Sequence, residues 1–154
     1  NTPPGGAPSI AYGGGCWELA PGDALVIDHD VPDAHYWNWS VHHLHRFDSG
    51  PWHQRPMSCN GQQAHIDRDQ RVRLVVAHVD PGVPNWLDTS GFAEGYVTYR
   101  WMLAESCPEP QATQVKAAEL LKHLPAKIKR ITPDARREQL AARRRGVINR
   151  FGNL

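Results

Sequence analysis

Four apolar stretches of strand length constrain the fold of this chain more than any other feature. They are rich in β-branched and aromatic residues and span 23–28, 35–41, 71–79 and 95–103. The connections between them, such as 48–51 and 80–85, are full of turn-forming residues, and no helical pattern separates the strands. Because parallel strands need helical crossovers, this pattern predicts a mainly β fold, an antiparallel β-sandwich.

The pattern changes after the Pro-Glu-Pro segment at 108–110. Apolar residues take helical spacing over 114–124, where Pro125 ends the expected helix, and a second helix is expected to begin at Thr132 and Pro133. The first residues are rich in proline and glycine, which indicates a linker or an irregular leading strand. We therefore divide the chain into that leading segment (1–15), a β-sandwich domain (16–108) and a helical basic arm (109–154).

The net charge of +1 hides a division between the arm and the rest of the chain. Residues 114–154 hold eleven of the seventeen Lys and Arg but three of the sixteen Asp and Glu, so they carry +8 and the rest carries −7. We expect the arm to pack on the acidic body or on a partner chain, partly through charge. Leu140, Ile148 and Phe151 should make that contact. We do not expect nucleic-acid binding, because the arginines come without aromatic interleaving or a recognised module.

Composition places the chain in the class of single globular domains. Its 154 residues are 40% hydrophobic, and no apolar run approaches the roughly eighteen residues of a membrane span. Three cysteines without a C-x-x-C pair favour neither a disulfide framework nor a zinc ribbon. A cytoplasmic location is the default expectation.

One block, Asp80 to Gly91 (DPGVPNWLDTSG), resembles a known family. With 95–101 after it and the strands at 23–27 and 71–76 before it, the block resembles the bacterial C-terminal domain family catalogued as domain of unknown function 1214. The resemblance covers roughly residues 12–108. It implies a jelly-roll-like β domain within a longer protein, and it implies no catalytic residues.

Histidines form the candidate metal site. His43 and His45 have the two-residue spacing that points side chains from one face of a strand, and His35 shares that face if the strand continues. His29 ends the preceding strand and is a candidate third ligand, as are Asp28 and Asp30. Neutral imidazoles bind zinc, copper or iron, so a cupin-like, metal-dependent enzyme is one alternative. The other alternative is that these histidines only form hydrogen bonds at a strand end and bind no metal.

The preferred hypothesis is a domain that binds a small, partly apolar ligand in a metabolic role. Six tryptophans are many for this length, and indoles at one end of a sandwich suit such a ligand, although core packing also explains them. The candidate ligand-binding residues are Trp37, Trp39, Asn60, Asn85, Trp86 and Arg100. A structural assembly domain that associates through the arm is the third alternative, and no nucleophile motif assigns a catalytic residue.

Overall fold

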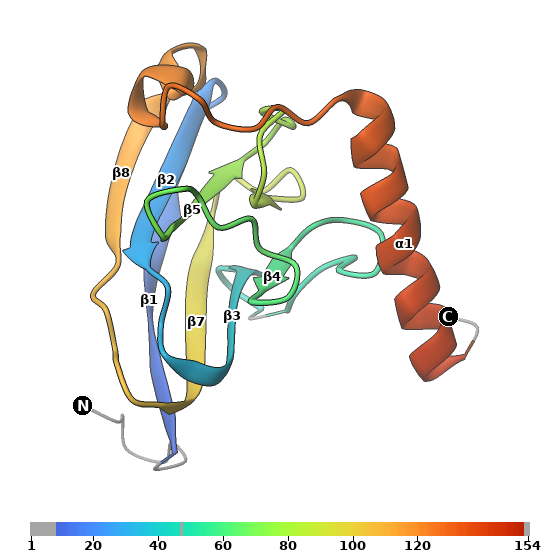
Figure 1. Cartoon of the computed structure of the whole chain (residues 1–154). Coiled ribbons are helices and arrows are strands. Elements are labelled where there is room, and N and C mark those ends of the chain that lie inside the picture. The colour runs from blue at the N-terminus through green and yellow to red at the C-terminus, as the bar shows by residue number, and fades with distance from the viewer. Residues whose placement is uncertain (1–8, 47, 153–154) are drawn as a thin grey trace.

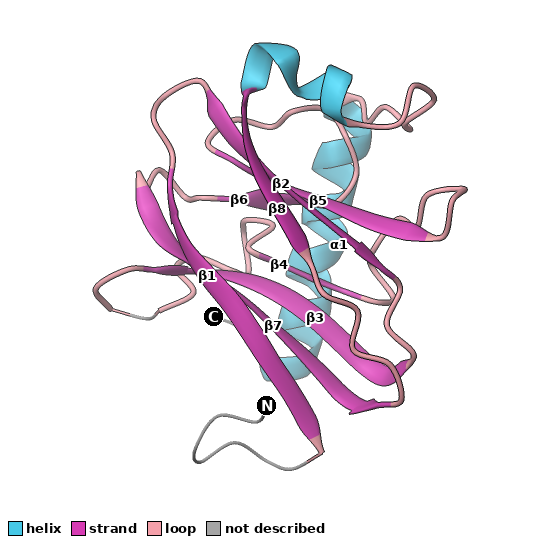
Figure 2. Cartoon of the chain, turned by 90° about the vertical axis from the view of Figure 1, so that its left-hand side faces the viewer, coloured by secondary structure: helices cyan, strands magenta, loops and turns pink. Residues whose placement is uncertain are grey.

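The computed structural model describes residues 9–46 and 48–152. Its eight strands form two four-stranded sheets, followed by a short 3-10 helix and one α-helix (Figures 1 and 2). The expectation of a mainly β fold with a helical C-terminal segment is confirmed. Of the four predicted strands, each corresponds to one of the longer strands described below.

The first sheet has the order β1-β7-β3-β4 and is antiparallel throughout. These strands are β1 (Ile10–Glu18), β7 (Glu94–Ala104), β3 (Ala34–His43) and β4 (Ser58–Asn60). The late strand β7 therefore lies between the first and third strands of the chain. This arrangement brings Trp101 of β7 opposite Trp37 of β3.

The second sheet has the order β6-β5-β2-β8. It contains β6 (Trp86–Asp88), β5 (Arg71–Ala77), β2 (Asp23–Asp30) and β8 (Gln111–Lys116). β5 and β6 pair in parallel, which departs from the purely antiparallel expectation. The short link of residues 78–85 turns the chain back without a helix, so β6 can run in the direction of β5.

The main core lies between the two sheets. Alternation points every second side chain of each strand inward, where Trp37, Trp39 and Trp101 of the first sheet meet Leu74 and Ile27 of the second. The opposite face of the second sheet is also buried. Its apolar residues lie under the 3-10 helix η1 (Ala117–His123) and the segment after it, in a cluster of Ala24, Val26, Val75, Ala77, Val83, Trp86, Val115, Leu120 and Leu124.

One expected element was wrong, and for another the strand alternative fits the residues that the structure describes. The segment predicted as a helix over 114–124 is instead the end of β8 followed by η1, because residues up to Lys116 pair with β2. The leading segment over 1–15 contains the first half of β1, which pairs with β7 from Ile10 onward.

The C-terminal helix α1 (Pro133–Phe151) begins where the sequence predicts. Thr132 caps it, since its Oγ1 accepts a hydrogen bond from the Ala135 amide at 3.2 Å, and Pro133 takes the first helical position. The preceding segment crosses over one end of the sheets, so α1 lies on the far side of the molecule from β8 (Figure 1). Within the described residues, no helix is long and apolar enough to cross a membrane.

Candidate functional site

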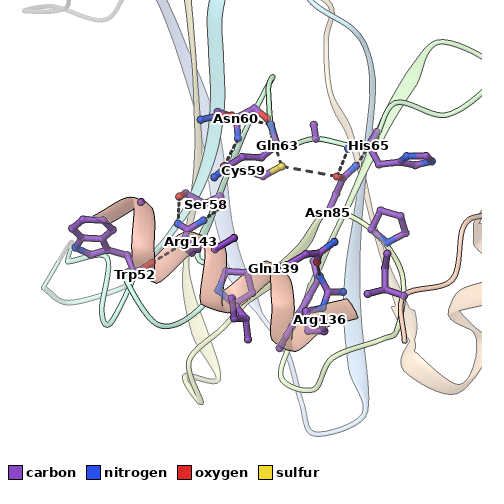
Figure 3. Close-up of a pocket in the computed structure, with 18 of the residues that line it drawn as sticks. Trp52, Ser58, Cys59, Asn60, Gln63, His65, Asn85, Arg136, Gln139 and Arg143 are labelled. Carbon is purple, nitrogen blue, oxygen red and sulfur yellow. Dashed lines mark hydrogen bonds between the residues drawn. The ribbon is translucent and has the colours of Figure 1, made fainter. Parts of the chain in front are cut away.

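A cavity of about 780 Å³ lies between α1 and the body of the domain. Residues 136–151 of α1 form one wall. The opposite wall comes from Trp52, from β4 and the turn after it, and from the loop that leads into β6 (Figure 3). Pockets for small molecules usually measure about 300–1,000 Å³, so this cavity has the size of a ligand site.

The wall formed by α1 combines arginines with apolar side chains. Arg136, Arg143 and Arg150 follow each other at intervals of seven residues, which is close to two helical turns, and all three line the cavity. Leu140 and Val147 lie on the same face. The helix therefore meets the body through long cationic side chains, which hold it away from the sheets and leave the cavity between them.

Arg136 anchors the first turns of α1. Its guanidinium forms two bonds to the Asp80 carboxylate at 2.9 and 3.1 Å and donates to the Val83 carbonyl at 2.7 Å. It also donates to Gln139 Oε1 at 2.9 Å and lies 5.3 Å from the centre of the Trp86 ring. With 8% of its surface exposed, Arg136 is buried, and it forms four hydrogen bonds, two of them to a carboxylate. Its role is to dock the helix.

The conformation of the loop between β5 and β6 places Asp80 and Val83 where they bind Arg136. Gly82 has a φ of 65° and donates its amide to Asp80 Oδ1 at 2.9 Å, which orients the carboxylate. Asn85 has a φ of 54°, a left-handed conformation that asparagine tolerates. Its side chain bonds the amide and carbonyl of His65 and the carbonyl of Arg73. The Asp80 to Gly91 block thus builds the edge of the cavity.

Arg143 fastens the middle of α1 to the opposite wall. Its Nε donates to the Trp52 carbonyl at 2.6 Å, and its two terminal nitrogens donate to the carbonyl and hydroxyl of Ser58 at 3.1 and 2.6 Å (Figure 3). All three acceptors are neutral oxygens. Burial lowers the pKa of Arg143, and the Cys59 thiol opposes that shift.

Cys59 lies in the same wall and is the one buried cysteine of the three. Burial raises the pKa of its thiol to about 12. Because the thiolate is the nucleophile, this cysteine is inert at neutral pH. The cavity therefore contains binding groups and no activated thiol.

Half of the predicted ligand-binding residues line this cavity. Asn60, Asn85 and Trp86 do so, although Asn60 Oδ1 accepts the amides of Gln62 and Gln63 and so shapes a turn. The structure places the other three elsewhere. Trp37 and Trp39 are buried in the core because their alternation points them between the sheets, and Arg100 is exposed, with its guanidinium 5.7 Å from the Tyr12 ring centre.

The four histidines of the predicted metal site are not brought together. His29 is fully buried among tryptophans, where its Nε2 accepts from Trp39 Nε1 at 2.9 Å and its Nδ1 lies 2.8 Å from the Asp30 carbonyl. Both ring nitrogens are thus engaged. His35 is exposed on β3, and the His43 and His45 rings lie 6.0 Å apart beside Phe92 and Glu94. Across residues 9–46 and 48–152, no three His, Cys, Asp or Glu side chains form a group that could hold a metal ion.

Sequence reasoning missed most of the polar residues of the cavity. Arg136, Arg143 and Arg150 were treated as part of a general basic charge, Trp52 was counted only among the six tryptophans, and Ser58, Gln63 and Gln139 were not considered. The interval of seven between the arginines is a signal that could have found the α1 face. The contact itself was expected. Leu140 and Phe151 line the cavity, Phe151 meets Trp52 edge to face at 6.1 Å, and Ile148 lines a smaller hollow beside His53.

Comparison with known proteins finds similarity only among solved structures. No family model and no curated protein matches the chain. An uncharacterised protein from Burkholderia cenocepacia is similar over 74% of this chain, with 36% identity and a TM-score of 0.71. A protein from Vibrio parahaemolyticus is similar over 68% of this chain, with 14% identity and a TM-score of 0.52, which shows a shared fold alone. The matches cover 32% and 31% of those two chains, so this chain spans about a third of their length.

Proposed function

We propose that this domain binds a small, partly apolar molecule in the cavity beneath α1, as one part of a longer bacterial protein with a metabolic role. The cavity itself carries the proposal, because a concave space of about 780 Å³ lined by aromatic and polar side chains has the size and composition of sites for small molecules. The much greater length of the similar bacterial proteins supports the second part.

The lining of the cavity fits such a molecule. Trp52, Trp86 and Phe151 offer aromatic surface, and Gln63 and Gln139 offer amides that can orient a polar group. Phe151 keeps 59% of its surface exposed although it faces the body. An apolar ligand between α1 and the body would cover surface that water now reaches, and removing apolar surface from water is favourable.

We also propose a jelly-roll-like classification and membership of the domain of unknown function 1214 family. The return of β7 to lie beside β1 is the kind of connection found in Greek-key sandwiches, and the Asp80 to Gly91 block supports the family. The three cysteines are unpaired, which supports a reducing, cytoplasmic location.

Titration with N-phenyl-1-naphthylamine, an uncharged apolar fluorophore, tests the binding proposal. Gly146 lines the cavity, and a side chain added there meets nothing within 4 Å, so Gly146→Phe should fill part of the space. Ala141→Phe places the same ring on an exposed part of the same helix. We expect saturable binding at one site, weakened about tenfold or more by Gly146→Phe and unchanged by Ala141→Phe.

Two results would contradict the proposal. One is the absence of saturable binding to the unmodified protein. The other is an equal loss of affinity in the two phenylalanine variants, since that would place the fluorophore outside the cavity.

A further inference from the structure

We propose that the molecule held beneath α1 carries an organic oxyanion, a carboxylate or an equivalent group, and that Arg143 binds it. This inference rests on the proposed binding function and specifies the chemistry of its ligand. It follows from the bonding of one arginine and from the distribution of charge around the cavity.

Arg143 is a cation without a counter-ion. Its hydrogen-bond partners, the carbonyls of Trp52 and Ser58 and the Ser58 hydroxyl, are neutral, and it forms no ion pair with any carboxylate in residues 9–46 or 48–152. A guanidinium has five N–H groups, and these bonds use three of them. One N–H on each terminal nitrogen therefore remains, on a side chain that lines the cavity.

The contrast with Arg136 shows what is missing. Both arginines extend from the same face of α1, and Arg136 is buried while Arg143 is half-buried. Arg136 meets the Asp80 carboxylate through two parallel bonds, the geometry that guanidinium groups favour. Partial burial of a charge is unfavourable unless the charge is paired, and Arg143 lies at the equivalent position seven residues later without a counter-ion. An anion in the cavity would supply it.

The rest of the lining has the same sign. Lys129 and Arg150 also face the cavity, while none of the described lining residues is an Asp or a Glu. This absence is notable because the chain outside residues 114–154 carries −7. Clefts lined by one sign of charge concentrate ligands of the opposite sign. Both observations favour an anionic ligand, and the aromatic surface of Trp52 and Phe151 favours one with an apolar body.

A pair of fluorophores that differ by one sulfonate tests the inference. 8-Anilinonaphthalene-1-sulfonate is N-phenyl-1-naphthylamine with that single anionic group added. Because Arg143→Gln also removes ties between α1 and the body, it can weaken binding of both fluorophores, and we expect it to weaken binding of the sulfonate about 10- to 100-fold more than binding of the uncharged fluorophore, the range of a charge-assisted hydrogen bond. Added salt should weaken only the sulfonate.

Two further variants separate the charge of Arg143 from its structural ties. Arg143→Lys keeps the charge and should retain more sulfonate affinity than Arg143→Gln. Arg145→Gln removes the same charge from an exposed position of α1 outside the cavity, and should change neither affinity. Displacement of the sulfonate by 1-naphthoate or 1-naphthyl phosphate supports the inference, and the stronger competitor identifies the oxyanion.

The inference is overturned if Arg143→Gln and Arg143→Lys weaken both fluorophores by the same factor, because Arg143 would then be only a tie between helix and body. It is also overturned if neither competitor displaces the sulfonate. If the uncharged fluorophore binds the cavity and the sulfonate gains nothing from Arg143, this inference fails while the proposed binding function stands.

Discussion

Arg136 and Asp80 form a bidentate ion pair across 56 positions of sequence, with N···O distances of 2.9 and 3.1 Å. The pair fixes the first turns of α1 to the loop between β5 and β6. Since few strand residues touch α1 directly, this pair and the bonds of Arg143 set the position of the helix, and with it the width of the cavity.

The first prediction concerns this ion pair. Arg136→Met should lower the free energy of unfolding by about 2–3 kcal/mol, because it leaves the Asp80 carboxylate and the Val83 carbonyl without their donor. Arg137→Gln is the matched control, since Arg137 pairs with Asp134 at the exposed surface and should contribute under about 0.5 kcal/mol. Urea unfolding measures both. Equal stability of the two variants would show that Arg136 does not anchor the helix.

Strands β2, β3, β5 and β7 could be predicted from the sequence, and the edge strand β8 could not. The stretch at 71–79 is rich in apolar residues because both faces of β5 are buried. That run of apolar residues is a local signal that the sequence shows directly. β8 instead buries only Val115, and its other residues are exposed. β8 is a strand because it pairs with β2, which lies about ninety residues earlier in the sequence. A local sequence pattern cannot show a pairing between segments so far apart.

The cavity was missed for a related reason. The apolar residues of α1 predicted contact with the body, but nothing in that pattern showed that Arg136, Arg143 and Arg150 share the inner face and line a cavity. Asn85 and Trp86 were found because they stand in a distinctive block. Arg143 does not stand in a distinctive sequence block. Its role depends on hydrogen bonds to the carbonyls of Ser58 and Trp52, which are distant in sequence and come close only in the folded chain.

The second prediction concerns the thiols. Cys16 and Cys107 are exposed, and Cys59 is buried with a pKa raised to about 12. A disulfide reagent such as 5,5′-dithiobis(2-nitrobenzoate) should therefore modify two thiols rapidly in the native protein, and the third only after unfolding. Rapid modification of all three at neutral pH would mean that the wall of the cavity opens readily.

The third prediction uses two glycines of the first sheet. A methyl group at Gly95 would come within 2.5 Å of the His42 carbonyl oxygen and of the Trp17 ring, and backbone cannot move aside easily. Gly95→Ala should destabilise the fold by about 1–3 kcal/mol or more. At Gly15 a methyl group meets nothing within 4 Å, so Gly15→Ala should be neutral or slightly stabilising. A reversed order in thermal or urea unfolding would contradict the packing described for β7.

The fourth prediction concerns pH and begins with His29. Trp39 Nε1 must donate, so His29 Nε2 accepts and the Nδ1–H donates to the Asp30 carbonyl. The folded protein thus holds the neutral ring. Burial, the largest effect, lowers the pKa of His29 below its ordinary value of 6.5, and burial likewise lowers the pKa of His42. Near pH 6.5 these two histidines take up protons in the unfolded chain, whereas in the folded chain they do so only at lower pH.

Stability should therefore be fully present above pH 6.5 and fall as the pH is lowered below it, by up to about 1.4 kcal/mol per pH unit for each histidine. Urea unfolding between about pH 7.5 and 5.5 measures this slope, in a window above the range where Asp23 and Asp69 take up protons, because both have a lowered pKa.

His29→Gln removes the group and should flatten the slope, whatever its effect on stability at pH 7.5. His35→Gln makes the same substitution at an exposed position of β3 and is the matched control. If His29→Gln retains the full pH dependence, proton uptake by His29 is not what weakens the fold in mild acid.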